Sequence, residues 1–162
     1  MMEKLETEAV AVTCQVFETM FFLTVAPQGG QYDSFGEGPS PPFSAYFQGE
    51  VGFQGRRSGK LVISIPVELA RAMASNFLGL EEALASEAQA MDMVSEVCNM
   101  ICGNLFSRLD KKTVWNLSIP ATREVSRYAL DGREVHQSLA VRFNAEGYPI
   151  QLHIQFSPED KK

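Results

Sequence analysis

The sequence predicts an α+β domain in which two long helices pack on an antiparallel sheet, with a pseudo-twofold internal repeat. Residues 3–25 and 87–109 both carry apolar side chains at helical spacing. Between and after them lie short apolar or alternating segments bounded by turn residues, which is typical of antiparallel hairpins. A shift of 84 residues places Val10 on Val94 and Phe21 on Leu105, and this match predicts the repeat.

Length and charge limit the possible classes of protein. With 162 residues, we expect one domain, residues 1–162, that buries its own core. The chain has 20 acidic and 14 basic side chains and a net charge of −6, so we expect no nucleic-acid partner. Three Cys and two His are too few for a disulfide framework or for most zinc sites.

The first helical segment is followed by an irregular one. Gln15 and Glu18 interrupt the apolar stretch within residues 3–25, so we expect a buried amphipathic helix and no membrane span. The Gly/Pro-rich loop at residues 27–45 holds four Gly and four Pro in nineteen residues. It is either a binding lid or a tolerated surface insertion, and its few charged groups favour the insertion.

A hairpin and a shorter helix come next. Residues 46–53 and 60–65 read as two strands joined by a turn at 54–59. Pro66 suits the first position of a helix over residues 67–78, which Gly79 ends.

The second long helix is predicted at residues 87–109. Ser86 and Gln89 form a capping box at its start. The remaining elements are all extended segments or turns: strands at 113–119 and 123–130, a turn at 131–132, and a hairpin pairing 135–143 with 150–156.

The cysteines and histidines are not expected to carry the chemistry. An odd number of Cys without a signal peptide fits reduced thiols in a cytoplasmic protein. Cys98 and Cys102 share a helix face, either as small core residues, which we favour, or as a metal or redox pair. His153 falls on the polar face of the last strand and His136 in or near a strand, and we expect both at the surface.

One polar set stands out on the second long helix. At about 100° per residue, Asp92, Glu96, Asn99 and Gly103 lie on one arc away from the core. The expected core stripe is made of Met91, Val94, Cys98, Ile101 and Leu105. An exposed helix face often holds such residues by chance, so the pair of Glu96 and Asn99 alone is a weak signal.

The wider pattern resembles the CheC/CheX/FliY family of chemotaxis phosphatases. The spacing Asp92-x3-Glu96-x2-Asn99, with Pro120 in a later extended segment, is similar to the signature of that family. Residues 16–20, and 52–66 running into 70–79, also resemble it, so the likeness extends over about residues 3–156. The 84-residue shift places Val12 on Glu96 and Gln15 on Asn99, which leaves one copy of the motif, as in the CheX branch.

The resemblance implies dephosphorylation of a phosphorylated CheY-like receiver. It implies that Glu96 pairs with a receiver Lys and that Asn99 orients the attacking water, with Asp92, Gly103 and Pro120 as further partner-binding residues. The chain would hold no metal or cofactor of its own, because the receiver supplies Mg²⁺. A cytoplasmic homodimer without membrane or nucleic-acid partners is expected.

The chemistry suits these residue types. An aspartyl phosphate has a stable carboxylate leaving group, so the main requirement is an in-line water beside a neutralised phosphoryl group. A neutral amide positions that water without repelling the phosphoryl oxygens. The alternatives are a non-catalytic adaptor of the same fold that binds a chemotaxis or flagellar-switch partner, and an unrelated domain with a chance motif.

Overall fold

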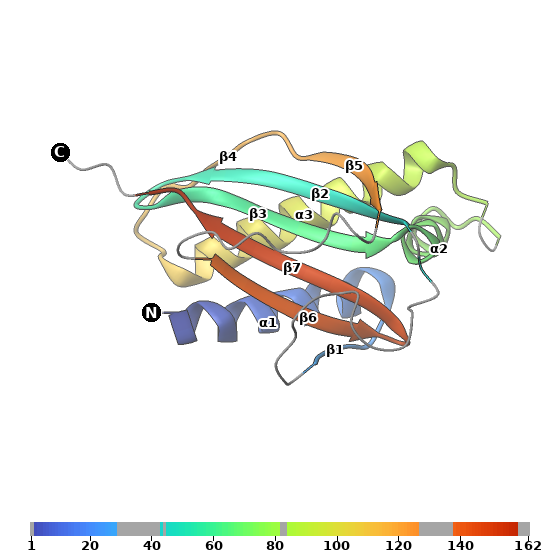
Figure 1. Ribbon diagram of the computed structural model, residues 1–162, viewed down its shortest axis with the longest axis horizontal. Helices are drawn as coiled ribbons and strands as arrows, with labels where there is room; N and C mark the ends of the chain where they lie inside the picture. Colours follow the sequence, from blue (N-terminus) through green and yellow to red (C-terminus); the bar gives the residue numbers. More distant parts are fainter. Residues whose placement is uncertain (1, 29–42, 44, 82–83, 127–137, 159–162) are drawn as a thin grey trace.

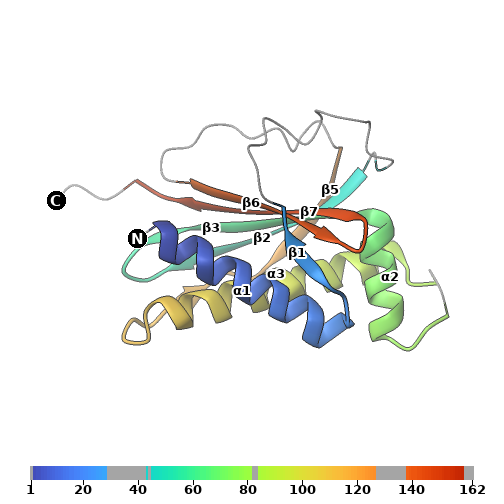
Figure 2. The same ribbon diagram turned by 90° about the horizontal axis from the view of Figure 1, so that it is seen from below.

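Three helices cover one face of a seven-stranded antiparallel sheet in the computed structural model, which describes residues 2–28, 43, 45–81, 84–126 and 138–158 (Figures 1 and 2). The helices are α1 (Met2–Phe21), α2 (Val67–Phe77) and α3 (Glu87–Leu109). The strands are β1 (Val25–Pro27), β2 (Ala45–Gln54), β3 (Ser58–Pro66), β4 (Asn116–Leu117), β5 (Ala121–Ser126), β6 (Ser138–Ala145) and β7 (Tyr148–Phe156). The predicted α+β class is confirmed. None of the helices in the described ranges has the length and hydropathy of a membrane span.

The order of the strands has the predicted twofold character. The sheet runs β1-β6-β7-β3-β2-β4, and β5 lies beside β2 along the same edge as β4. The edge strand β1 pairs with β6 and the edge strand β5 pairs with β2, while β3 pairs with β7 at the centre. Each half of the chain therefore places its edge strand against the hairpin of the other half.

The two long helices match with an offset of 85 residues rather than 84. With this offset, every buried residue of α1 falls on a buried residue of α3. The pairs are Leu5/Ala90, Ala9/Val94, Val12/Val97, Thr13/Cys98, Val16/Ile101, Phe17/Cys102 and Phe21/Phe106. The sequence match was one residue short because it compared residue types, whereas the structural repeat preserves the buried face.

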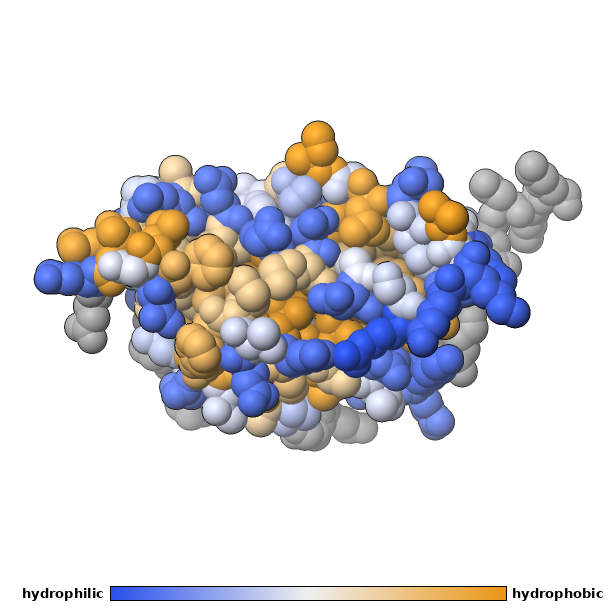
Figure 3. Space-filling view, turned by 180° about the vertical axis from the view of Figure 1, so that it is seen from behind, coloured by the Kyte–Doolittle hydropathy of each residue, from blue (hydrophilic) through white to orange (hydrophobic). Residues whose placement is uncertain are grey.

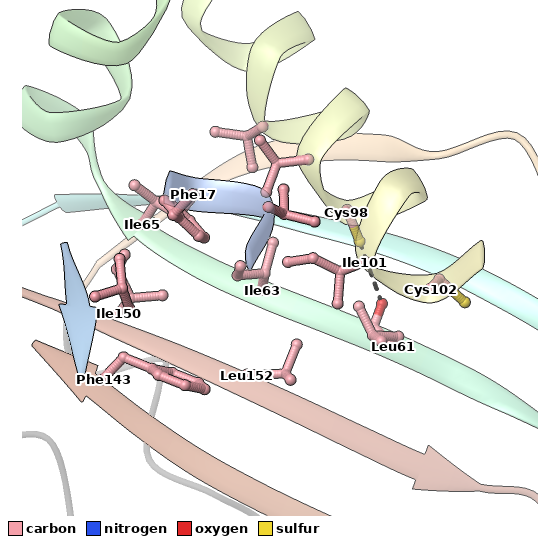
Figure 4. Close-up of a cluster of buried hydrophobic side chains, with 14 of the residues drawn as sticks. Phe17, Leu61, Ile63, Ile65, Cys98, Ile101, Cys102, Phe143, Ile150 and Leu152 are labelled. Carbon is pink, nitrogen blue, oxygen red and sulfur yellow. Dashed lines mark hydrogen bonds between the residues drawn. The ribbon is translucent and has the colours of Figure 1, made fainter. Parts of the chain in front are cut away.

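The core lies between α1, α3 and the inner face of the sheet (Figure 4). Cys98 and Ile101 of α3 point toward Leu61 and Ile63 of β3, and all four are fully buried. The Cys98 Sγ donates a hydrogen bond to the Leu61 carbonyl at 3.6 Å. Each large apolar side chain removed from water contributes about 1.5–3 kcal/mol. Burial of this apolar face therefore holds α3 in one orientation, with its opposite face exposed to solvent.

Helix α1 is shorter than the predicted 3–25. Phe22 adopts a left-handed φ of 56°, its N–H binds the Glu18 carbonyl at 3.1 Å, and the Leu23 N–H binds the Phe17 carbonyl at 3.3 Å. The bond from the Phe22 N–H to the Glu18 carbonyl is that of an αL cap, here formed without glycine. The chain then continues into the short edge strand β1, which the sequence did not predict.

The other predicted elements agree with the observed ones to different degrees. The bounds 87–109 and the capping box of Ser86 and Gln89 are confirmed, and the first hairpin is confirmed with slightly longer strands. The strand predicted at 113–119 is reduced to β4, and β5 lies at 121–126. Most of the loop at 27–45, the turn at 131–132 and His136 lie outside the described residues.

Candidate functional site

The polar arc of α3 lies on the outer face of the helix. Asp92 and Glu96 are exposed, and Asn99 and Gly103 are half-buried. Of the predicted core stripe, Val94, Cys98, Ile101 and Leu105 are buried, whereas Met91 is half-buried. Glu96 and Asn99 are three residues apart, and such residues are neighbours on a helix surface. A partner approaching this face can therefore contact the carboxylate and the amide together.

Glycine at position 49 sets the distance between α3 and the sheet. A Cβ at Gly49 of β2 would lie 3.0 Å from Val94 Cγ1 and 3.3 Å from both Cys98 Cβ and the Val94 carbonyl oxygen. These contacts are tighter than nearly all real Cβ contacts, so a larger residue would require Val94 or the helix backbone to move by a few tenths of an ångström. Gly49 thus holds the motif-bearing helix directly on β2.

A hydrogen bond at one end and a close neighbour at the other place the segment 117–122 along the outer side of α3. The hydroxyls of Ser95 and Thr122 share a hydrogen bond of 2.6 Å. At the other end, a Cβ on Gly103 would lie 3.7 Å from Leu117 Cδ1. Asn99 lies midway between Ser95 and Gly103 along the helix, so from these two neighbours we infer that residues 119–120 pass beside Asn99.

This edge segment contains a β-bulge at residues 118–120. Leu117 pairs with Phe53 and Ala121 pairs with Glu50, so the three residues 118–120 face only two residues of β2, 51 and 52. Ser118 keeps its place: its N–H donates to the Gly52 carbonyl at 2.9 Å, and its hydroxyl accepts from the Gly52 N–H at 2.8 Å. The extra residue falls at Ile119 and Pro120, and proline is tolerated there because a bulge leaves a residue out of the hydrogen-bond ladder.

The bulge presents an apolar side chain to solvent. Ile119 is 91% exposed, the largest value among the exposed large hydrophobic residues of the described chain. From the helical side, an apolar projection stands over the connection between β4 and β5 (Figure 3). Sequence reasoning named Pro120, which is half-buried, but missed Ile119; an isoleucine directly before a proline in an extended segment was the available signal.

Gly103 was expected to permit a close backbone approach. An added Cβ would meet only Leu117 Cδ1, at an ordinary van der Waals distance. Packing among the described residues therefore does not require glycine at this position, and the surface beside it is open to a partner.

The cysteines on α3 belong to the core. Burial raises the pKa of the Cys102 thiol to about 12. The pKa of Cys98 is also raised, first by burial and then by the neighbouring Cys102 and Glu50. Both thiols therefore remain protonated at neutral pH and are poor nucleophiles. The interpretation as small buried core residues is confirmed.

The described histidine lies on β7 and not on α3. His153 is half-buried on β7, and burial, followed by the charge of Lys60, lowers its pKa. Within the described residues, no group of three or more His, Cys, Asp or Glu side chains is placed to hold a metal ion.

The equivalent face of α1 lacks the motif. With the 85-residue offset, Ala11 occupies the place of Glu96 and Cys14 that of Asn99. Gln15, the residue that the 84-residue shift had aligned with Asn99, accepts a hydrogen bond from Arg108 at 2.6 Å. The expectation of a single motif copy holds in the corrected register.

A family model described as chemotaxis phosphatase CheX matches residues 47–144, which are 98 of the 162 residues and include the whole arc and the bulge. The chain belongs to the CheX family. No curated protein sequence matches it.

Several solved structures share the CheX fold. A chemotaxis protein CheX from Vibrio vulnificus is 21% identical, with a TM-score of 0.69 over 94% of this chain and 96% of that one. A CheX–CheY–BeF3–Mg²⁺ complex from Borrelia burgdorferi gives 20% identity and a TM-score of 0.67, with coverage of 94% and 97%. FliY from Thermotoga maritima is more distant, at 13% identity and a TM-score of 0.57, with coverage of 96% and 90%.

Proposed function

We propose that this chain accelerates hydrolysis of the phosphoaspartate of a CheY-like response regulator. The observation that carries the proposal is the placement of Glu96 and Asn99 together on the outer face of α3, in a member of a chemotaxis phosphatase family. The similarity to a chain solved in complex with CheY supports a partner of the CheY type.

Asn99 is the residue that we assign to the reacting water. Its amide carries both a donor and an acceptor, so it can hold a water by the carbonyl oxygen without adding negative charge beside the phosphoryl group. The leaving carboxylate needs no proton, so the rate gain comes from orientation of the water. This fits an arc whose four residues include no Ser, Thr, Cys or His.

Glu96 is assigned to orientation of the complex. An exposed carboxylate one helical turn from Asn99 can accept a charge-assisted hydrogen bond from a receiver lysine. Asp92 extends the acidic surface by one more turn. We expect the receiver to bring the Mg²⁺ that neutralises the phosphoryl oxygens, and this chain to add no metal.

The bulge and Gly103 complete the docking surface. Ile119 would give the receiver an exposed apolar contact beside the helix that carries Asn99, and Pro120 restricts the backbone there. The absence of a side chain at Gly103 allows the partner backbone to approach the helix. The apolar contact supplies affinity, while the polar pair sets the orientation.

Asn99→Ala tests the mechanism, with Asn104→Ala as the matched control. Asn104 is exposed on the same helix, about 140° away from Asn99 at about 100° per residue. With a CheY-like receiver phosphorylated by acetyl phosphate, Asn99→Ala should lose about 10²- to 10³-fold in acceleration, whereas Asn104→Ala should match the parent protein. Unchanged dephosphorylation by folded Asn99→Ala would exclude the proposed role.

An adaptor of the same fold is the alternative function, because the exposed Ile119 would serve binding equally well. It predicts a stable complex with the phosphorylated receiver and an unaltered phosphate lifetime. We further propose a homodimer, which multi-angle light scattering would test; a monomer mass at micromolar concentration would contradict it.

A further inference from the structure

A second candidate site lies at the end of the molecule opposite α2, where the start of α1, the β2–β3 turn and the end of α3 come together (Figure 1). These segments and the end of β7 line a partly open cavity of about 530 Å³. Ligand pockets typically have about 300–1,000 Å³. Its apolar lining consists of Met2, Leu5, Phe106, Leu109, Trp115 and Phe156.

The aromatic wall of this cavity is held in place. The ring centroids of Phe106 and Trp115 are 4.8 Å apart, and those of Phe106 and Phe53 are 4.1 Å apart. Trp115 Nε1 donates a hydrogen bond to the Asp110 carbonyl at 3.3 Å, and the Trp115 ring packs so closely on Gly55 that a Cβ there would clash. A wall that is ordered before binding loses little entropy when a ligand arrives.

The charged lining has the opposite sign to the whole chain. Three cations line the cavity, Lys4, Arg56 and Arg57, in a protein whose net charge is −6. The one carboxylate in the lining is Asp110, which already accepts hydrogen bonds from the Thr113 hydroxyl and from two backbone N–H groups. Arg56 lies 3.5 Å from this carboxylate, and the side chain of Arg56 is 72% exposed.

We propose that this cavity binds a small amphipathic anion, with an alkyl or aromatic body against the apolar wall and a carboxylate facing Arg56, Arg57 and Lys4. The Arg57 guanidinium lies 4.8 Å from the centre of the Phe156 ring, so charge and apolar surface meet at one edge of the cavity. Leu109 is ten residues from Asn99, or about 15 Å along the helix, so this site is separate from the proposed phosphatase site and does not depend on it.

Trp115 provides a direct readout, because it is the only tryptophan in the chain. Titration of the full-length protein with decanoate should change its fluorescence and reach saturation. Decanol, which has the same alkyl chain without the carboxylate, should bind more weakly. Arg56→Gln and Arg57→Gln should each weaken decanoate binding about three- to tenfold and leave decanol binding unchanged.

Arg71→Gln is the matched control, since Arg71 is an exposed arginine on α2 outside the cavity. It should bind decanoate like the parent protein, and circular dichroism checks that each variant is folded. Equal binding of decanoate and decanol, equal weakening by Arg71→Gln, or no response at millimolar decanoate would overturn the proposal. So would a fluorescence change that follows protein concentration alone, because a second copy of the chain would then occupy the cavity.

Discussion

Replacing Ile119 with serine separates docking from chemistry at the proposed site. The Ile119 side chain is 91% exposed in the free protein, so its removal should change the free energy of unfolding by less than about 0.5 kcal/mol. If the receiver covers this side chain, the apolar contribution lost is about 1.5–3 kcal/mol, the value for full burial of an isoleucine. At about 1.4 kcal/mol per factor of ten, KM for the phosphorylated receiver should rise about ten- to hundredfold.

The maximal rate should change little, because an isoleucine side chain offers the phosphoryl group and the attacking water no hydrogen bond. Initial rates of phosphate release at several receiver concentrations give kcat and KM separately. Val114→Ser is the matched control, because Val114 is 80% exposed and precedes the bulged segment. A KM for Ile119→Ser equal to that for Val114→Ser would refute the docking role, whatever the effect of Asn99→Ala.

Two further predictions concern the packing of α3 on the sheet. Gly49→Ala should lower the free energy of unfolding by about 1–3 kcal/mol in urea titrations, because the new Cβ would lie 3.0 Å from Val94 Cγ1; an unchanged midpoint would contradict the close packing. The raised pKa of Cys98 and Cys102 should make stability pH-dependent, since both thiols stay protonated in the folded chain while unfolded thiols ionise near pH 9.0. Their contribution is complete below pH 9.0 and is lost as pH rises towards about 12, by up to about 1.4 kcal/mol per pH unit for each thiol, and Cys102→Ala should show a shallower decline.

The elements that local signals define were predictable from the sequence. Helix α3 was predicted to the residue because Ser86 and Gln89 cap its start, and its apolar period also indicated which residues point outward. The end of α1 was not predictable in this way, because Phe22 adopts a left-handed conformation that usually signals glycine. Strand β1 was missed because its three residues, which are ordered by pairing with β6, are too few to form a recognisable strand pattern.

The site was predictable only on its helical side. Asp92, Glu96 and Asn99 share a face because of helix geometry alone, whereas the position of Ile119 beside the helix that carries Asn99 depends on pairing between distant segments. The bulge exists because the register of β4 on β2 differs by one residue from that of β5 on β2. Register between strands far apart in sequence depends on the tertiary structure, so no local pattern at residues 118–120 predicts it.

The pseudo-twofold fold has two equivalent positions in which a helix lies beside an edge strand, and the motif residues are present at only one of them. Beside α3, the edge segment is bulged, and the helix carries Glu96 and Asn99. Beside α1, the edge strand β1 pairs with β6 in unbroken register, and the corresponding helix positions hold Ala11 and Cys14. The difference therefore lies in both the helix and the neighbouring edge strand. Because both features lie on the α3 side and neither is found beside α1 within the described residues, the pseudo-symmetry supports our proposal that the arc on α3 and the bulge at Ile119 form one functional surface.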